Sequence, residues 1–173
     1  PCRLSACVDF SFWPTQALNL QGFAAQTTTF GPGGDGGAQR LAASTNTGRY
    51  SFNLQHLRID PEADAQLGFI TRTGIQQTGG NTRVTWRPTA LGLRNVNWLT
   101  FGDYIARTDA VLQDWRFANA IDLVFRSGEN ITVYRRQGFT RIDEEFDLAD
   151  SLAVPAGDYD DNVTGFFVIS DPG

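Results

Sequence analysis

The sequence predicts an all-β fold, an antiparallel up-and-down meander of about nine long strands in one domain over residues 1–173. Three observations favour this class. Apolar and polar residues alternate with a period of two over most of the chain. No segment keeps a helical period long enough to predict a helix. Short and long connections alternate between the strand-like segments. This pattern fits part of a transmembrane β-barrel or, as the alternative, a soluble β-sandwich.

Each predicted strand is a run of alternating residues bounded by Gly, Pro, Asn or Asp, which favour turns. The nine segments, in chain order, are Leu4 to Trp13, Ala17 to Phe30, Ala38 to Asn46, Arg49 to Ile59, Asn81 to Arg87, Leu93 to Arg107, Ala110 to Phe125, Asn130 to Thr140 and Asp158 to Ser170. The sixth and seventh run about 15 residues, whereas strands of globular proteins usually stop at about 10.

The segment from Val111 to Phe125 has two different sides. Its odd-numbered residues are large and mostly apolar, and its even-numbered residues are charged or small. Pairing it with the preceding strand about the tight turn at Asp109 predicts a register of charge, aromatic and large–small pairs, the matches that cross-strand neighbours favour. The predicted pairs are Asp103 with Arg116, Tyr104 with Trp115, Gly102 with Phe117, Phe101 with Ala118 and Leu99 with Ala120.

The connections differ in length at the two ends of the predicted sheet. Short turns are expected at 14–16, 46–48, 88–92, 127–129 and 171–173, and long loops at 31–38, 60–80 and 141–157, with a tight turn at 108–109 as the exception. Outer-membrane barrels have short turns at one end and longer loops at the other, and a soluble sandwich has no reason to keep this parity. Loop parity and strand length therefore favour a membrane barrel.

In that interpretation the apolar side of the long strands faces lipid and the polar side faces a lumen. The predicted lipid-facing residues are Trp98, Tyr104, Trp115, Phe117, Ile121 and Phe125. The candidate lumenal or ligand-binding residues are Asp103, Arg107, Asp114, Arg116, Asp122 and Arg135. Mixed charges in a barrel interior suit polar neutral or zwitterionic ligands, although the same residues would also pair across strands simply to fill the interior.

Composition excludes several classes of function. The net charge of -5 argues against nucleic acid as a partner, and no apolar run approaches the roughly 20 residues of a membrane helix. All 14 basic residues are Arg. Cys2 and Cys7 are expected to be free thiols, with a local bridge or a partner outside this sequence as alternatives.

Two stretches resemble a bacterial family of unknown function. The first is HLRIDPEADAQLGFITRTGI, His56 to Ile75, followed by a strand that ends in TWRP, Thr85 to Pro88. The second is ITVYRRQGFTRIDEEFDLADSLAVPAGDYD, Ile131 to Asp160. Members of that family commonly carry an amino-terminal carbohydrate-binding module of the family-nine type ahead of an outer-membrane-like β-barrel. The resemblance covers roughly Leu18 to Gly173 and implies a place in the barrel region.

The resemblance implies location and architecture more than chemistry. It implies an outer-membrane protein with lipid as its surroundings, a saccharide as the class of polar ligand, and a chain that is a fragment with a module upstream and further strands downstream. No cofactor and no catalytic residue are expected from it. The alternatives are a secreted β-sandwich that serves as a binding or adhesion module, and a hydrolase.

Other polar clusters are weaker candidates. Asp158, Asp160 and Asp161 are candidate calcium ligands without the spacing of an EF-hand, and turn chemistry is the alternative. The acidic run within residues 143–150 is the site of the hydrolase alternative, although neighbouring carboxylates on an extended chain point to opposite sides. His56 is the only histidine, which leaves no His-based zinc site.

Overall fold

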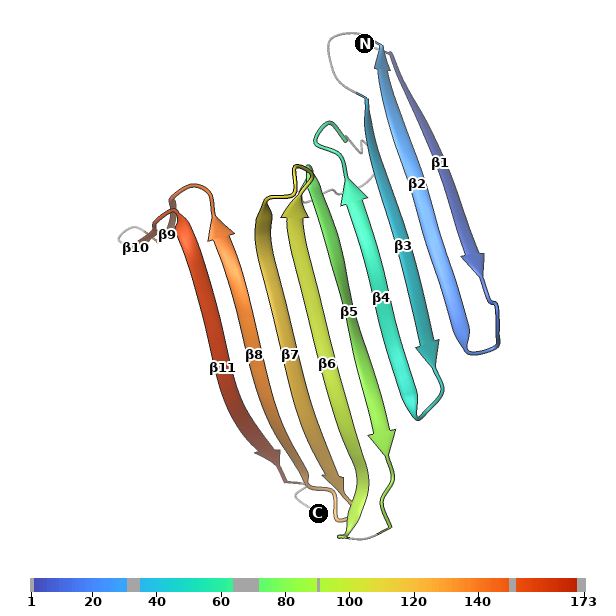
Figure 1. The fold of residues 1–173 in the computed structure, drawn as a ribbon, viewed down its shortest axis with the longest axis vertical. Helices are drawn as coiled ribbons and strands as arrows, with labels where there is room; N and C mark the ends of the chain where they lie inside the picture. Colours follow the sequence, from blue (N-terminus) through green and yellow to red (C-terminus); the bar gives the residue numbers. More distant parts are fainter. Residues whose placement is uncertain (1, 31–34, 64–71, 90, 150–151, 171–173) are drawn as a thin grey trace.

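The fold is a single antiparallel sheet of nine strands in the order β1-β2-β3-β4-β5-β6-β7-β8-β11, so each strand up to β8 pairs with the next along the chain (Figure 1). The structure is a computed structural model, and it describes residues 2–30, 35–63, 72–89, 91–149 and 152–170. The predicted all-β meander is thus confirmed. The two outer strands, β1 and β11, do not pair with each other, so the sheet is open.

The strands have the following bounds: β1 Cys2–Phe12, β2 Leu18–Phe30, β3 Gly36–Asn46, β4 Tyr50–Ile59, β5 Ile75–Trp86, β6 Leu93–Arg107, β7 Leu112–Phe125, β8 Asn130–Ile142 and β11 Gly157–Ile169. A separate two-stranded sheet pairs β9 Phe146–Ala149 with β10 Leu152–Val154. This small hairpin lies in the connection between β8 and β11, where the sequence predicts only a loop.

Four strands, β1, β3, β5 and β11, begin earlier than the sequence predicts, and the largest change is in β5. β5 starts at Ile75 rather than Asn81, because the polar, glycine-rich stretch from Gln76 to Gly80 pairs fully with both neighbouring strands despite its lack of alternation. β3 starts at Gly36, where the turn at Glu62 and Ala63 packs so closely that a Cβ would meet its backbone. The connections 31–35 and 60–74 are therefore shorter than expected.

The predicted pairing of β6 with β7 is confirmed residue by residue. Asp103 lies opposite Arg116, Tyr104 opposite Trp115 and Gly102 opposite Phe117. A bulge near the turn, where Ala106 pairs with Leu112, shifts the register by one residue at that end. Because the ladder is regular from Asn95 to Ile105, alternate residues of these strands define two faces that continue across the sheet.

The two faces differ in character. We call the side that carries Phe117 and Ile121 the apolar face, and the side that carries Asp103 and Asp122 the polar face. Fourteen of the exposed large hydrophobic side chains lie on the apolar face, on every strand except β2: Val8, Phe10, Phe12, Leu41, Tyr50, Leu54, Trp86, Trp98, Tyr104, Phe117, Ile121, Val133, Phe166 and Val168. No second layer of the described chain covers that face.

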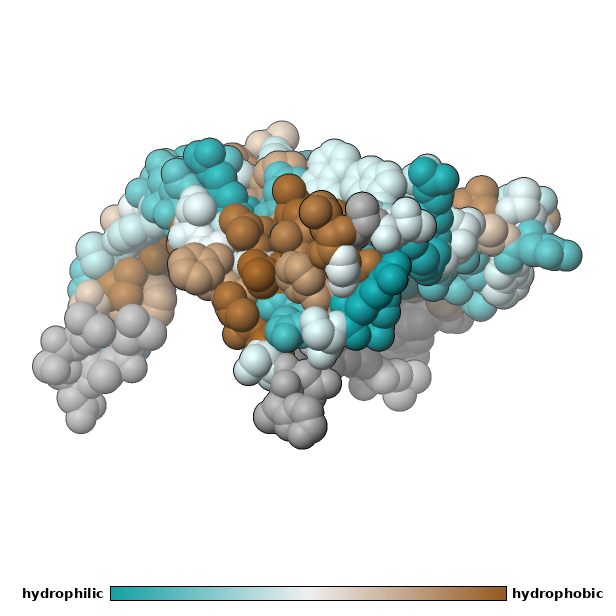
Figure 2. Space-filling model, turned by 90° about the horizontal axis from the view of Figure 1, so that it is seen from below, coloured by the Kyte–Doolittle hydropathy of each residue, from teal (hydrophilic) through white to brown (hydrophobic). Residues whose placement is uncertain are grey.

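Almost no hydrophobic core exists within the described part of the chain. Its buried apolar residues are Ile59, Ile75, Leu93 and Ala106. Viewed along the strands, the sheet is curved into an open arch with hydrophobic residues gathered in the middle of the visible end (Figure 2). A sheet normally buries its apolar face against another layer, so this one needs a covering from outside the described residues.

The connections retain part of the predicted asymmetry. One end of the sheet carries the connections 13–17, 47–49, 87–92 and 126–129, and the other carries 31–35, 60–74, 108–111 and 143–156 (Figure 1). The second end is called the loop end below. The asymmetry depends on 60–74 and 143–156. Among the described residues no helix is long and apolar enough to cross a membrane.

Candidate functional site

The polar face is the best candidate site, because it gathers most of the predicted charged residues and bonds many of them across strands. Asp103 and Asp114 lie towards the loop end, Arg116 lies beside Asp103, and Asp122 lies towards the opposite end. Asp103, Asp114 and Asp122 are only partly exposed. Together they form a polar surface rather than a single focused centre.

Asp122 is the centre of a hydrogen-bond chain that crosses four strands. Its Oδ2 accepts a hydrogen bond of 2.8 Å from Asn97 Nδ2, and its Oδ1 accepts one of 3.0 Å from Thr132 Oγ1. The Oδ1 of Asn97 in turn accepts a hydrogen bond of 2.9 Å from Thr85 Oγ1. Since a carboxylate with two donors is well satisfied, Asp122 ties β5 to β8 on this face.

The other predicted residues of the polar face have different partners. Asp103 accepts a hydrogen bond of 2.9 Å from Gln77 Nε2 on β5, and Asp114 accepts one of 2.9 Å from Thr140 Oγ1 on β8. Arg116 is exposed, and its guanidinium makes no hydrogen bond or ion pair within the described chain. The register that places Asp103 opposite Arg116 does not make them an ion pair.

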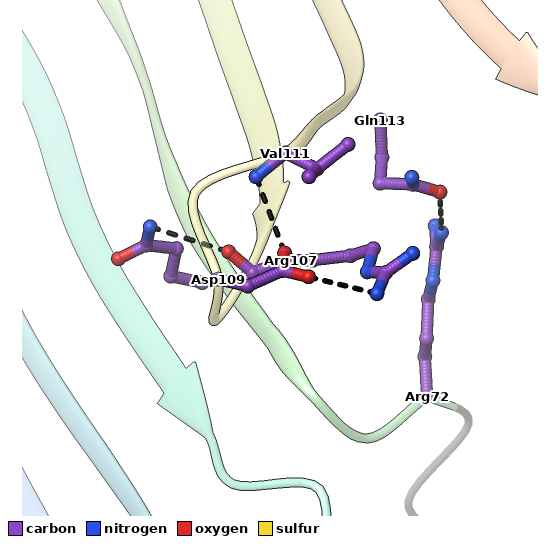
Figure 3. Close-up of polar contacts among 6 residues, drawn as sticks. Arg72, Arg107, Asp109, Val111 and Gln113 are labelled. Carbon is purple, nitrogen blue, oxygen red and sulfur yellow. Dashed lines mark hydrogen bonds and ion pairs between the residues drawn. The ribbon is translucent and has the colours of Figure 1, made fainter.

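Arg107 belongs to a turn rather than to an open polar surface. Its Nη2 lies 2.8 Å from Asp109 Oδ2, and Asp109 Oδ1 accepts a hydrogen bond of 3.3 Å from the backbone N–H of Val111 (Figure 3). The backbone of the turn closes with hydrogen bonds between Arg107 and Val111 and between Ala110 and Arg107. Nearby, Arg72 donates a hydrogen bond of 2.7 Å to Oε1 of the buried Gln113. Both contacts fasten the loop end of β6 and β7.

The prediction that Arg135 belongs with the other charged residues is wrong. Arg135 lies opposite Asn119 on β7 and Thr164 on β11, which places it on the apolar face. Its neighbour Arg136 is the arginine on the polar face, where it forms an ion pair of 2.9 Å with Asp161. Two adjacent arginines on one strand necessarily point to opposite faces.

The predicted calcium ligands do not converge. Asp158 and Asp160 lie on the apolar face and Asp161 on the polar face, because β11 alternates through all three. Arg141 instead donates two hydrogen bonds of 2.7 and 2.8 Å to the Asp158 carboxylate. No group of three or more metal-ligating side chains is present among the described residues.

This ion pair lies at the loop end of the sheet. The hydrogen bonds from Arg141 hold the pKa of Asp158 below its ordinary value, and the same contact raises the pKa of Arg141. Each group is therefore held in its charged form.

The remaining candidates are scattered. Asp143, Glu144, Glu145 and Asp147 are exposed around the start of β9, and Asp150 lies outside the described residues. His56 shares a hydrogen bond of 2.8 Å with Thr78 on the apolar face. Cys7 is an exposed free thiol, and the side chain of Cys2 lies outside the described part of the structure.

A hollow on the apolar face was not predicted from the sequence. It has a volume of about 580 Å³ and is centred on Gly80 and Gly102, with Phe52, Tyr104 and Phe117 among its walls. A Cβ on Gly80 would meet the backbone of Asn53, so close approach of β4 and β5 depends on this glycine. The hollow is shallow and almost entirely apolar.

A second unpredicted feature is a polar pocket of about 280 Å³ on the polar face, at the end of the sheet opposite the loop end. It is lined by Arg49, Arg83 and Arg87 together with asparagine and hydroxyl side chains. These arginines come from separate parts of the sequence, so no linear motif marks them. Only the pairing of β4, β5 and β6 brings them together.

Comparisons of the chain with family models, with curated proteins and with solved structures found no match. The family resemblance of the two motifs therefore remains an expectation from the sequence. What the chain itself supplies is a one-layer sheet with one apolar and one polar face.

Proposed function

We propose that this chain forms part of the wall of a β-barrel in a bacterial outer membrane, with its apolar face against lipid and its polar face towards a lumen that binds or admits a polar ligand. The observation that carries the proposal is the apolar face, which extends across the nine-stranded sheet and which no layer of the described residues covers. Soluble monomers rarely expose contiguous apolar patches beyond a few hundred Å².

The position of the apolar residues along each strand supports a tilted barrel. On β1 the apolar side chains are centred on Phe10. Following the cross-strand pairs from Phe10, one strand at a time, leads to Phe139 on β8. The apolar stretch of β8 is instead at Val133 and Ile131, about six to eight residues nearer the opposite end. The apolar band therefore crosses the strands obliquely.

The slope of this band matches barrel geometry. The band shifts by about seven residues over the seven steps from β1 to β8. With a rise of about 3.3 Å per residue and a spacing of about 4.8 Å between strands, this shift corresponds to an angle of roughly 35° between the band and the ladders of paired residues. Strands of outer-membrane barrels tilt by about 35–45° from the barrel axis, so a layer of lipid at constant depth would cross the residue ladders at such an angle.

On β7 and β8 the polar residues of the apolar face lie towards the loop end from Ile121 and Val133. Asn119 and Arg135 form one cross-strand pair, and the pair of Trp115 with Phe139 lies further towards the loop end. Long arginine side chains reach out of the hydrocarbon, and tryptophan favours the level of the lipid head groups. This order fits the edge of a bilayer.

The polar face supplies a suitable lumenal lining. Its carboxylates accept hydrogen bonds from neighbouring strands, and Arg116 remains available to a ligand. Mixed charges and amides favour polar neutral or zwitterionic solutes. A saccharide is the ligand class that we propose, and this part rests on the family resemblance.

The test is extraction and gel migration of the full chain expressed with its native flanking sequence. A barrel wall partitions into detergent with the outer-membrane fraction and migrates differently before and after heating. Recovery in the aqueous fraction without heat-modifiable migration would overturn the proposal and favour a secreted sandwich, whose second sheet would cover the apolar face.

A further inference from the structure

The polar pocket at the end of β5 concentrates positive charge. Its three arginines come from the turn between β3 and β4, from within β5, and from just beyond the end of β5, and no carboxylate is among its lining residues. The other lining side chains include Asn46, Asn95 and Asn97. The pocket is thus locally cationic in a chain whose net charge is -5.

None of the three guanidinium groups is neutralised by a carboxylate of the described residues. The Arg83 guanidinium makes no hydrogen bond or ion pair within the described chain, the Arg87 guanidinium donates to the carbonyl oxygen of Gly48 at 3.3 Å, and that of Arg49 lies over the ring of Tyr50 at 5.3 Å. By contrast, the ion pairs Arg58–Asp60, Arg107–Asp109, Arg136–Asp161 and Arg141–Asp158 neutralise arginines elsewhere in the sheet. The pocket is therefore electropositive.

Hydrogen bonds hold one wall of the pocket in place. Asn97, one of its walls, is held between Thr85 and Asp122 by hydrogen bonds of 2.9 and 2.8 Å. Asp122 is engaged by Asn97 and Thr132 and does not line the pocket. The wall is thus fixed, while the guanidinium groups keep their donors for a ligand.

We infer that this pocket binds a tetrahedral oxyanion, a phosphate or sulfate group, either free or as the charged group of a larger polar ligand. A guanidinium presents a planar fork of donors that matches such oxygens in a bidentate manner. Several cations in one concave site also raise the local concentration of anions. The inference does not depend on the membrane proposal, because the pocket lies on the polar face.

The experiment is a calorimetric titration of the folded full chain in an uncharged detergent at constant ionic strength. The probes are inorganic phosphate and glucose 6-phosphate, with glucose as the uncharged comparison. We expect saturable binding of both phosphates and none of glucose. Tighter binding of glucose 6-phosphate than of inorganic phosphate would identify a phosphorylated ligand. Equal affinity for the two would identify the free oxyanion. Either result supports the site.

The matched variants are Arg83→Gln inside the pocket and Arg136→Gln outside it on the same face, where Arg136 is paired with Asp161. Arg83→Gln should weaken phosphate binding by about 10-fold or more, as expected for the loss of a charge-assisted hydrogen bond, while Arg136→Gln should leave it unchanged. If Arg83→Gln fails to fold by circular dichroism, Arg49→Gln takes its place. Absence of saturable phosphate binding, or equal loss in both variants, would overturn the inference.

Discussion

Asp103 on β6 lies directly opposite Arg116 on β7, yet its carboxylate accepts a hydrogen bond from Gln77 on β5 and forms no ion pair with Arg116. Two residues that lie opposite each other in the ladder therefore need not form a side-chain contact. Arg116 is consequently an exposed cation whose side chain contributes little to holding the sheet together.

The first prediction concerns Arg116 itself. Arg116→Gln should change the free energy of unfolding by no more than about 0.5 kcal/mol, because an exposed side chain with no polar partner in the described chain loses no contact. Urea unfolding in detergent micelles, followed by tryptophan fluorescence, measures this. A loss above about 2 kcal/mol would mean that Arg116 is paired in solution.

Asp122 should behave in the opposite way. Asp122→Ala removes the acceptor for Asn97 and Thr132 and should lower the free energy of unfolding by about 1–3 kcal/mol, because two donors then lack their partner. The same urea titration applies, with Arg116→Gln as the control. Equal stabilities of the two variants would contradict the hydrogen-bond chain across β5 to β8.

Two glycines on the apolar face provide a matched pair. Gly80→Ala should destabilise the sheet by about 1–3 kcal/mol, since the added Cβ would meet the carbonyl oxygen of Asn53 and lie 3.2 Å from the Cα of Leu54. Gly102→Ala should be tolerated, because its Cβ would meet only Phe117 Cδ2, at 3.8 Å. Urea unfolding of both variants checks this. Greater damage from Gly102→Ala would show that β4 and β5 are not paired as described.

The ion pair between Arg141 and Asp158 predicts a pH dependence at the loop end of the sheet. The pKa of Asp158 is lowered in the folded chain, so its stabilising effect is complete above the ordinary pKa of an aspartate and is lost as the pH falls through the lowered value. The protection factors of the β11 amides, which are corrected for the intrinsic pH dependence of exchange, should therefore fall at acidic pH. Asp158→Asn should remove that dependence, and a wild-type response in this variant would assign it to another group.

Much of the fold could be predicted because its longest strands alternate clearly. The pairing of Tyr104 with Trp115 follows from the position of the turn at Asp109 and from the match of side chains across the two strands. The first half of β5 could not be predicted, because Gln-Gln-Thr-Gly-Gly shows no alternation and owes its place to neighbours on both sides. The hairpin of β9 and β10 is too short to have a recognisable period.

The candidate site could likewise be predicted only in part. Asp103 and Asp122 were assigned to the correct face because β6 and β7 fix each other's register. Arg135 was assigned to the wrong face because Arg136 follows it, and only the pairing with β7 decides which arginine points where. The arginine pocket had no signal in the linear sequence, since its residues come together only through strand pairing.

We propose that the apolar face meets lipid along an oblique band, and a nitroxide scan of β8 tests this most directly. Single cysteines from Asn130 to Ile142, in a background with Cys2 and Cys7 replaced by Ser, carry the label in lipid vesicles. We expect oxygen accessibility to alternate with a period of two, to be highest at Ile131 and Val133, and to fall from Arg135 towards Phe139. High accessibility to a water-soluble nickel complex at Ile131 and Val133, or no alternation, would contradict the account.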